Sequence, residues 1–352
     1  MPEPLYRIGF ASCARIYYKD AFSEQPPCKL DKNDFDQPVW GQIAEQHRLR
    51  KLDAMLLLGD QVYSDYGVSH DWGGGRPKQW GIARFHDLMY TMYQVQYEAV
   101  TGFKTLFESL KRSNTQVGVI WDDHDFGYNN GSGHEPLFKD KLGSTKALFE
   151  QFVAALNNPT TTYPTKPDIP AAQPTQGIER ITNPIKLQED VEIVLLDGRF
   201  YRSINEGNNG ELLGQTQWLK LQNKLETWDP AKLLIVCLGS TYSVGAKSPS
   251  DQSWMNRRSG TPYAHFNEFT ALAKDKRIIF LSGDIHRNKL IDHGGFCEVI
   301  SSGAHLPRKR DKPKFGLLDI YSDRVDVKLF EGNQIEKNIS KTINRMTGSI
   351  QQ

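Results

Sequence analysis

Five short stretches of this 352-residue sequence place acidic, histidine, cysteine or arginine side chains directly after apolar runs. Apolar runs of this length predict β-strands, and ligands of open α/β proteins bind beyond the carboxyl ends of strands. The stretches could therefore meet in one crevice although they lie far apart in the chain. They are Ala11-Ser12-Cys13, Gly59-Asp60-Gln61-Val62-Tyr63, Asp122-Asp123-His124-Asp125, Asp197-Gly198-Arg199 and Ser282-Gly283-Asp284-Ile285-His286.

The densest stretch, Asp122-Asp123-His124-Asp125, holds three carboxylates and one imidazole within four residues. Like charges this close repel each other, so that cations or hydrogen bonds must compensate them in a folded chain. A solvated acidic turn is the alternative, and the preceding apolar run Val117–Trp121 argues against it. His124 could bind a metal when it is neutral, or donate a proton to a leaving group when it is protonated.

The other stretches add further metal ligands. Asp60 follows a glycine, which permits a sharp turn and would suit a carboxylate that bridges two cations. Tyr63 could add a phenolate, which only a strongly Lewis-acidic ion such as ferric iron would keep deprotonated at neutral pH. Asp284 and His286 lie two residues apart, so both side chains would reach the same crevice if the strand continued. Cys13 is either a further ligand or a small core residue.

Two arginines follow the fourth stretch. The guanidinium groups of Arg199 and Arg202 could bind phosphate oxygens through paired hydrogen bonds. They could equally pair with nearby acidic side chains at the surface. The sequence alone leaves both interpretations open.

Seven apolar runs predict strands, and amphipathic segments between them predict helices, an alternation that favours an α/β sheet architecture. Two more runs, near 315–330, predict a C-terminal β-hairpin. The proline-rich segment near 157–184 predicts a long loop, of the kind that is usually a lid or disordered. No linker divides residues 1–352, and we expect a single domain. The strands are predicted at Leu5–Ala11, Ala54–Leu58, Gln116–Trp121, Val191–Leu196, Lys232–Leu238, Arg277–Leu281 and Cys297–Ile300, and the helices at Val39–Lys51, Ile82–Lys111, Lys139–Leu156, Gly214–Trp228 and Tyr263–Ala273.

The overall composition restricts the partners. Lys and Arg number 43 and Asp and Glu 42, giving a net charge of +1, which argues against a general nucleic-acid surface or a polybasic membrane anchor. No apolar run approaches the ~20 residues of a membrane helix, and the sequence shows no signal peptide. We expect a soluble chain with no membrane span and no stable nucleic-acid partner. The compartment and the oligomeric state stay open.

Taken together and in order, the motifs resemble the alkaline phosphatase D (PhoD-like) family. The resemblance runs from about Tyr6 to Phe330. Each motif is common by itself, and the set in this order is specific. The matching motifs are Ser12-Cys13, Gly59-Asp60-x-x-Tyr63, Trp121-Asp122-Asp123-His124-Asp125, Asp197-x-Arg199-x-x-Arg202, Leu213-Gly214-x-x-Gln217-Trp218-Leu219 and Leu281-Ser282-Gly283-Asp284-x-His286.

This family belongs to the calcineurin-like metallophosphoesterases. The resemblance implies a metallophosphatase-like α/β fold, a four-layer αββα sandwich of two mixed β-sheets flanked by helices. It also implies a centre that contains Fe³⁺ and Ca²⁺, although other divalent metals could bind. By position, the iron-like ion would be held by Cys13, Asp60, Tyr63 and His286.

The resemblance also assigns the remaining roles. Asp60 would bridge to a second cation, which Asp123 and Asp284 would help to hold. His124 takes the place of the superfamily's catalytic histidine, and Asp125 would orient it. Arg199 would contact phosphate, with Arg202 as a further substrate-binding residue. The additional histidine motif of the superfamily is not evident, because Gly239-Ser240-Thr241 stands where it would fall.

We therefore expect a metal-dependent phosphoester hydrolase in which a metal-bound hydroxide attacks phosphorus. The substrate would be a small-molecule phosphoester, or a phospholipid or polymer diester, and monoesters and diesters are not distinguished by these ligands. One alternative is a catalytically inactive, metal-containing binding protein. Another is a nuclease that uses the same metal centre, which the near-zero net charge disfavours.

Overall fold

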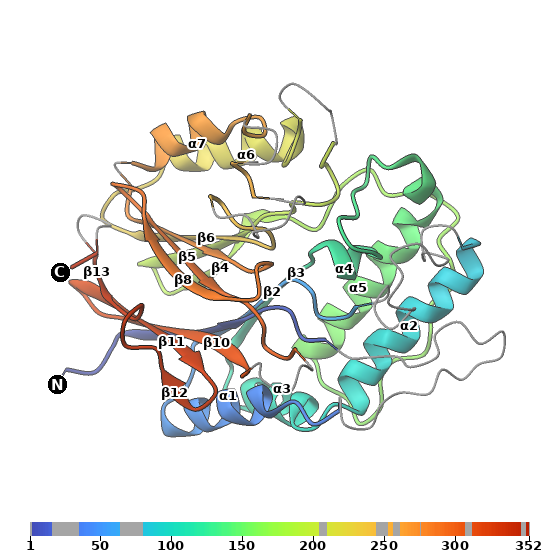
Figure 1. Ribbon diagram of the computed structural model, residues 1–352, viewed down its shortest axis with the longest axis horizontal. Coiled ribbons are helices and arrows are strands. Elements are labelled where there is room, and N and C mark those ends of the chain that lie inside the picture. Colours follow the sequence, from blue (N-terminus) through green and yellow to red (C-terminus); the bar gives the residue numbers. More distant parts are fainter. Residues whose placement is uncertain are drawn as a thin grey trace.

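Two mixed β-sheets lie face to face between helices (Figure 1), in a computed structural model that describes residues 2–15, 35–63, 80–203, 210–243, 253–255, 261–274, 276–306, 312–345 and 350–351. The layers are helices, sheet, sheet and helices, which confirms the expected αββα sandwich. None of the helices in these ranges is both long and apolar enough to cross a membrane.

The first sheet has seven strands, in the order β12-β11-β10-β1-β2-β3, with β13 paired to β11. Strands β1, β2 and β3 are parallel, and β10 pairs with β1 in the antiparallel direction. The predicted C-terminal hairpin is present as β10 and β11. The strands are β1 (Tyr6–Ala11), β2 (Ala54–Leu58), β3 (Gln116–Ile120), β10 (Lys314–Ile320), β11 (Arg324–Glu331), β12 (Gln334–Ile335) and β13 (Thr342–Asn344).

The second sheet has six strands, in the order β4-β5-β6-β7-β9-β8. Its four central strands are parallel, and the edge strands β4 and β8 run antiparallel to their neighbours. The strands are β4 (Arg180–Leu187), β5 (Val191–Leu195), β6 (Leu233–Leu238), β7 (Ile278–Ser282), β8 (Asn288–Asp292) and β9 (Cys297–Ser301).

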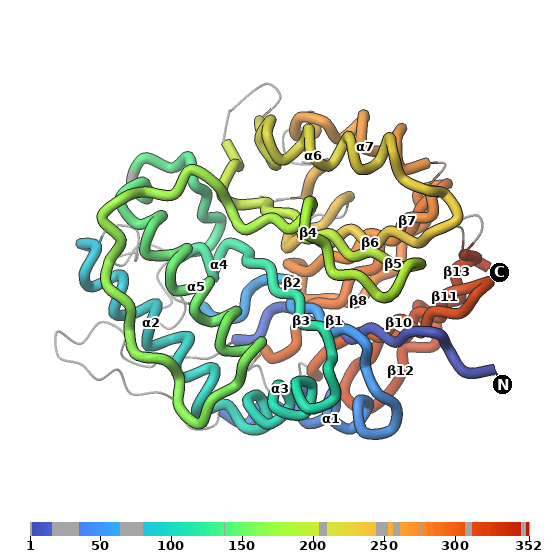
Figure 2. The backbone as a smooth tube through the Cα atoms, turned by 180° about the vertical axis from the view of Figure 1, so that it is seen from behind, coloured from blue at the N-terminus to red at the C-terminus, as the bar shows by residue number. Residues whose placement is uncertain are grey.

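Helices cover both outer faces. In Figure 1, α6 (Gly214–Glu226) and α7 (Phe266–Ala273) lie over the second sheet, and α1 (Pro38–Leu49) and α3 (Phe103–Arg112) lie over the first. The tube in Figure 2 shows α2 (Ile82–Glu98) and α5 (Leu142–Asn157) packed beside them, beyond the end of the sheets. Between these, the short helix α4 (Asp123–Phe126) follows β3 directly.

The core has three parts that match these layers. Residues such as Phe10, Leu56 and Val299 fill the space between the two sheets. Trp40, Met55 and Phe103 belong to the cluster under the helices of the first sheet, and Trp218, Val236 and Phe280 to the cluster under α6 and α7. Because the parallel strands are buried on both faces, they are almost continuously apolar, which is why they stand out in the sequence.

The single helix expected at Ile82–Lys111 is wrong, because two helices, α2 and α3, occupy this stretch. Gly102 begins the second of them with a φ of +79°, a left-handed conformation that glycine adopts readily and that breaks the helical path. The amphipathic pattern continues through the break because both helices cover the same core.

The proline-rich loop is shorter than expected, since β4 begins at Arg180. Pro184 is tolerated there because β4 is an edge strand with a register shift between Arg180 and Ile185. The loop itself lies on α2, where the hydroxyl of Tyr90 donates to the Pro164 carbonyl over 3.0 Å and that of Tyr97 to the Thr160 carbonyl over 2.9 Å.

Candidate metal centre

All seven parallel strands end at the same side of the molecule, and each is followed by a residue of the candidate centre. Strands β1, β2 and β3 come from the first sheet, and β5, β6, β7 and β9 from the second. The strand ends therefore converge across the two sheets, as the sequence pattern indicated. The residues that follow them are Cys13, Asp60, Asp122, Asp197, Ser240, Asp284 and Ser302.

The first group of side chains surrounds one carboxylate oxygen of Asp60. Asp60 Oδ2 lies 3.3 Å from the Cys13 sulfur and 3.2 Å from the Tyr63 hydroxyl oxygen. The same hydroxyl lies 3.2 Å from His286 Nε2. The structure thus brings together the four residues that the resemblance assigned to one ion.

The turn after β2 explains how Asp60 reaches this position. Gly59 and Asp60 have φ values of +87° and +57°, so the chain reverses within two residues. A Cβ atom on Gly59 would lie 2.5 Å from Asp122 Cβ, so only glycine allows the ends of β2 and β3 to come this close.

The acidic cluster after β3 is a helix start rather than an extended strand end. Asp122 and Asp125 form a capping box, in which each side chain accepts a hydrogen bond from the backbone of the other. The Asp125 carboxylate also accepts the backbone NH groups of Gln61 over 2.9 Å and Val62 over 3.2 Å. Asp125 thereby ties the Asp60 turn to α4.

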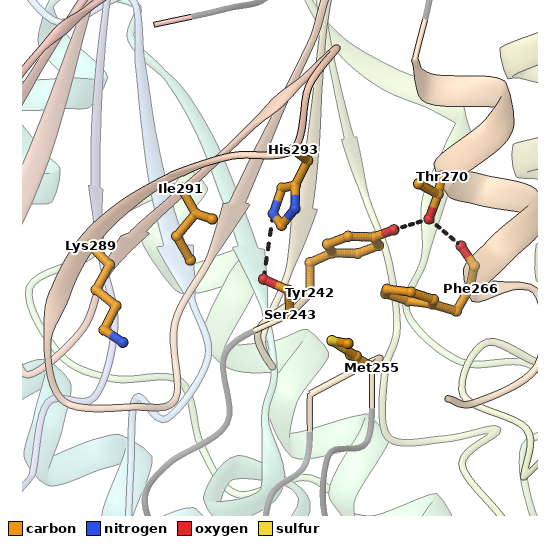
Figure 3. Close-up of a pocket in the computed structure, with 8 residues that line it drawn as sticks. All are labelled: Tyr242, Ser243, Met255, Phe266, Thr270, Lys289, Ile291 and His293. Carbon is orange, nitrogen blue, oxygen red and sulfur yellow. Dashed lines mark hydrogen bonds between the residues drawn. The ribbon is translucent and has the colours of Figure 1, made fainter. Parts of the chain in front are cut away.

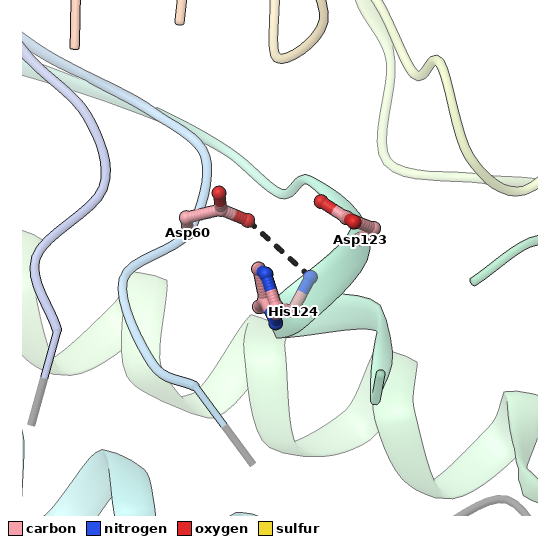
Figure 4. A group of neighbouring side chains, drawn as sticks. All are labelled: Asp60, Asp123 and His124. Atoms are coloured by element: carbon pink, nitrogen blue, oxygen red, sulfur yellow. Dashed lines mark hydrogen bonds between the residues drawn. The ribbon is translucent and has the colours of Figure 1, made fainter. Parts of the chain in front are cut away.

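Asp123 connects the first group to a second group of ligands. The second group is Asp122, Asp123 and Asp284, whose ligand atoms lie within 4.8 Å of one another. Ligand atoms of Asp60, Asp123 and His124 are equally close to one another. Figure 4 shows the carboxylates of Asp60 and Asp123 facing each other beside His124, whose backbone NH donates to Asp60 Oδ1 over 3.3 Å. Each Asp60 oxygen thus faces a different group, Oδ2 toward Cys13 and Oδ1 toward α4.

The His124 ring lies against Tyr63. The ring centroids are 4.0 Å apart, with an angle of 33° between the planes. Tyr63 also contacts Arg15, whose guanidinium carbon lies 5.2 Å from the centroid of the tyrosine ring. The tyrosine therefore fixes the imidazole beside the carboxylates.

Arg199 is fully buried beside the second group. Its Nε donates to Asp122 Oδ1, and a terminal nitrogen lies 3.4 Å from Asp123 Oδ1. A terminal nitrogen of Arg199 also donates to Ser240 Oγ over 3.1 Å. Arg202 reaches the same serine over 3.0 Å and the Gly198 carbonyl over 2.9 Å. Both arginines therefore lie inside the protein and not on its surface.

Two further residues of the family motifs support the backbone. Asp197 accepts the indole NH of Trp121 over 2.8 Å and the backbone NH groups of Arg199 and Phe200 over 2.9 Å each. Gln217, on α6, exchanges hydrogen bonds with the backbone NH and carbonyl of Asp197. This network fixes the turn from which Arg199 projects.

Asp284 and His286 reach the centre by a different route from the one expected. Strand β7 ends at Ser282, and Asp284 and His286 have φ values of +70° and +54°, so they lie on a turn and not on an extended strand. The His286 backbone NH donates to Ser302 Oγ over 2.9 Å. Non-glycine residues in this left-handed region are uncommon and cluster at functional sites.

Burial dominates the electrostatics of the first group. It raises the pKa of Asp60, Cys13 and Tyr63 well above their ordinary values, with Asp123 contributing to Asp60 and the Asp60 charge to the other two. Burial also lowers the pKa of His286 to about 4. The imidazole is therefore neutral at physiological pH and available as a ligand.

Two carboxyl groups of the second group, those of Asp284 and Asp123, differ in pKa. Burial and the neighbouring Asp122 and Asp123 raise the pKa of Asp284 to about 7. For Asp123, burial is outweighed by the charges of Arg199 and His124, which bring the pKa to about 2. Asp123 is therefore ionised in the metal-free protein, whereas Asp284 exchanges its proton near neutral pH.

These residues fit divalent or trivalent cations. Asp122 Oδ2 is buried and has no hydrogen-bond partner among the residues that the structure describes. A buried carboxylate oxygen without a partner is costly, and a cation would satisfy it. The first group offers sulfur, phenol and imidazole together with carboxylate, whereas the second offers carboxylates alone.

Sequence reasoning did not assign Asp122 or Ser240 to the centre. Asp122 belonged to the acidic cluster, but only the structure shows it opposite Asp284. In the sequence, Ser240 is marked only as part of Gly239-Ser240-Thr241, the segment that stands where the superfamily has its histidine motif. Its hydrogen bonds to Arg199 and Arg202 come from a strand order that the local sequence does not reveal.

Solved phosphatase structures share this fold. A structure of PhoD superposes with a TM-score of 0.61 and 15% sequence identity, covering 100% of this chain and 72% of that chain. A dimetal phosphatase from Danio rerio superposes with a TM-score of 0.54 and 12% identity, covering 97% and 100%. The fold is that of the metallophosphatases. No curated protein matches the chain significantly.

Residues 11–302 match the model of the PhoD-like phosphatase family, and the chain belongs to this family. The match covers every residue of the two ligand groups. The protein is therefore a metal-dependent phosphoesterase.

Proposed function

We propose that this enzyme hydrolyses phosphomonoesters or phosphodiesters at a centre of two unlike cations, Fe³⁺ in the first ligand group and Ca²⁺ in the second. The observation that carries the proposal is the position of Asp60, whose two oxygens face different ligand groups. A carboxylate so placed suits a bridge between two cations.

The donor atoms support unlike cations. Cys13, Tyr63 and His286 offer a thiolate, a phenolate and an imidazole, a set that suits ferric iron. Asp122, Asp123 and Asp284 offer oxygen ligands only, which hard cations such as calcium prefer. When bound, the two cations would supply charge neutralisation and a nucleophile derived from water at neutral pH.

The protein's own groups would do the rest of the chemistry. We assign to His124 the protonation of the leaving oxygen, because it lies beside both ligand groups and its ring contacts that of Tyr63. Arg199 would neutralise charge that develops on the phosphoryl oxygens. Arg202 would support it through their shared contact with Ser240.

The first test separates metal binding from proton transfer. Asp60→Ala should lose bound metal and activity together. His124→Ala should keep the metal and lower kcat by about 10²- to 10⁴-fold on an alkyl ester. The loss should be smaller on an aryl ester, because an aryl oxide leaves without protonation. Wild-type-like turnover by either variant, on both a monoester and a diester, would refute the role assigned to that residue.

Metal analysis tests the identity of the first cation. Cys13→Ala should lower the iron content of the purified protein and change any ferric–phenolate absorption band. Cys237→Ala is a matched control, because Cys237 is also a buried free cysteine but packs between the sheets. Equal iron content in both variants would show that Cys13 is not a ligand. Absence of turnover by the iron- and calcium-loaded wild type would favour an inactive binding protein.

A further inference from the structure

A single buried carboxylate, that of Glu298, joins the two segments of the second sheet that enter the metal centre. Glu298 lies on β9 and has 0% exposure. Its Oε1 accepts the Tyr242 backbone NH over 2.6 Å and the Ser282 hydroxyl over 3.0 Å. Its Oε2 accepts the Ser243 backbone NH over 3.2 Å and the Ser243 hydroxyl over 2.9 Å. Both oxygens are thus saturated by donors, which compensates the burial of the charge.

On the outer side, His293 contacts the same cluster. Its Nε2 lies 3.5 Å from Glu298 Oε2 and 3.4 Å from Ser243 Oγ. Figure 3 shows Ser243 and His293 together at the wall of a pocket of about 530 Å³. Tyr242 and Ser243, whose backbone NH groups donate to Glu298, line this pocket together with His293.

The donors to Glu298 belong to segments that carry residues of the centre. Ser282 ends β7 and stands two residues before Asp284. Tyr242 and Ser243 end the segment 239–243, which follows β6 and contains Ser240. One carboxylate therefore fixes the start of the Asp284 turn and the end of the Ser240 segment.

Ser240 connects this cluster to the buried arginines. Its hydroxyl lies 3.1 Å from a terminal nitrogen of Arg199 and 3.0 Å from one of Arg202, and it donates to Asp122 Oδ1 over 3.2 Å. A shift of the segment would move the serine relative to all three groups. Arg199 and Asp122 would then lose their common partner.

We propose that Glu298 is a positioning residue of the metal centre, which holds Ser240 against the arginines and Asp284 at the second ligand group. It touches neither substrate nor cation. Its kinetic effect rests on the hydrolysis in the proposed function, whereas its effect on cation affinity rests only on cation binding at the second ligand group.

The donor set explains why the charge matters. A carboxylate only accepts hydrogen bonds, whereas a glutamine side chain carries two donor hydrogens on one of its terminal atoms. In Glu298→Gln, the amide NH₂ would face either Tyr242 and Ser282 or the two donors of Ser243. The substitution keeps the volume and breaks half of the cluster, and Glu298→Asp keeps the charge but shortens the side chain.

The experiment measures kcat and KM on an aryl phosphate, and Ca²⁺ affinity by calorimetry, in the full-length protein. Residues that orient metal ligands typically change affinity or activity by about 10- to 100-fold when mutated. We expect Glu298→Gln to lower kcat and Ca²⁺ affinity within this range, with a smaller change in KM. Glu298→Asp should recover part of both losses.

A double-mutant cycle with Ser240→Ala tests whether Glu298 acts through Ser240. If it does, the double variant should lose hardly more kcat than Ser240→Ala alone. Additive losses would show that Glu298 does not act through Ser240. Values for Glu298→Gln within twofold of wild type, in both kcat and Ca²⁺ affinity, would overturn the whole proposal.

Asp319→Asn is the matched control, because Asp319 is also a buried carboxylate but lies at the opposite end of the first sheet. It pairs with Arg7 over 3.0 Å and Lys328 over 2.5 Å. Equal losses in this control would show that Glu298 contributes only to general stability.

If Glu298→Gln fails to fold, Ser282→Ala can replace it, because it removes one hydrogen bond from the same carboxylate. An unchanged Ca²⁺ affinity of Ser282→Ala would then show that Glu298 does not position Asp284. A wild type without turnover refutes the proposed function alone, since calorimetry still tests Glu298.

Discussion

Asp284 shows how function opposes stability at a single residue. Burial and the charges of Asp122 and Asp123 raise its pKa to about 7 from the ordinary value of 3.8, so the metal-free protein keeps the neutral acid up to about this pH. A cation requires the ionised form, and binding must therefore displace a proton near neutral pH. Burial also raises the pKa of Asp60, so cation binding must compete with protonation at this carboxylate as well.

The pH dependence of stability tests this conflict. Because the pKa of Asp284 is higher in the folded than in the unfolded chain, its stabilising contribution is complete below the unfolded value and is lost as the pH rises through about 7. In the metal-free protein, Asp284→Asn should therefore raise the melting temperature at pH 8 relative to wild type and change it little at pH 4. A difference that does not vary with pH would contradict this expectation. With saturating Ca²⁺ the sign should reverse, because the variant lacks a ligand.

At the scale of the elements, glycines after the parallel strands allow the two sheets to meet. A Cβ atom on Gly283, after β7, would lie 2.5 Å from Ser12 Oγ and 2.6 Å from the Leu58 carbonyl oxygen. Ser12 follows β1 and Leu58 ends β2, and both strands belong to the first sheet. The close approach of β7 to the first sheet thus depends on a missing side chain.

Gly283→Ala should therefore separate the strand ends that carry the two ligand groups. We expect a loss of about 1–3 kcal/mol in the free energy of unfolding, as is typical of overpacking, together with weaker cation binding. Gly41→Ala is the control, because Gly41 lies within α1 and an added Cβ would meet nothing within 4 Å. It should stabilise the protein by about 0.5–1 kcal/mol. Urea unfolding of both variants measures these changes, and equal effects would refute the steric explanation.

At the scale of the whole molecule, the metal centre connects two sheets that also share an apolar core and hydrogen bonds such as that from Asn288 to the Phe330 carbonyl. Cys13, Asp60 and Asp123 follow strands of the first sheet, whereas Asp284 and His286 follow a strand of the second. The core between the sheets does not include these residues. Folding should therefore not require the metal, although the metal should stabilise the fold.

Chelation tests this expectation. The metal-free protein should keep its far-ultraviolet circular dichroism and a cooperative thermal transition, at a lower melting temperature. A cation at 100 times its dissociation constant should restore about 2.7 kcal/mol. Complete unfolding on chelation, or a melting temperature that does not respond to added cation, would each contradict this interpretation.

The sequence by itself determined the seven parallel strands, the C-terminal hairpin, the residue types at the strand ends and the family, but not the strands β4, β8, β12 and β13. Parallel strands buried on both faces are continuous apolar runs, and a ligand that directly follows such a run must lie at the carboxyl edge of the sheet. This local logic placed Cys13, Asp60 and Asp123 just after strands before any strand order was known. It failed where the backbone leaves the helical path, as between Glu98, where α2 ends, and Gly102, the N-cap of α3.

Only the tertiary structure decided which of these residues touch. Tyr63 and His286 are separated by 223 positions, and Ser240 and Asp122 by 118. Such pairs depend on how the two sheets face each other, which no local pattern encodes. The same reason hid Glu298, an isolated acid in an apolar strand whose donors come from the ends of two other strands. Local patterns identified the groups that can do the chemistry, and the packing of the sheets decided the arrangement in which they meet.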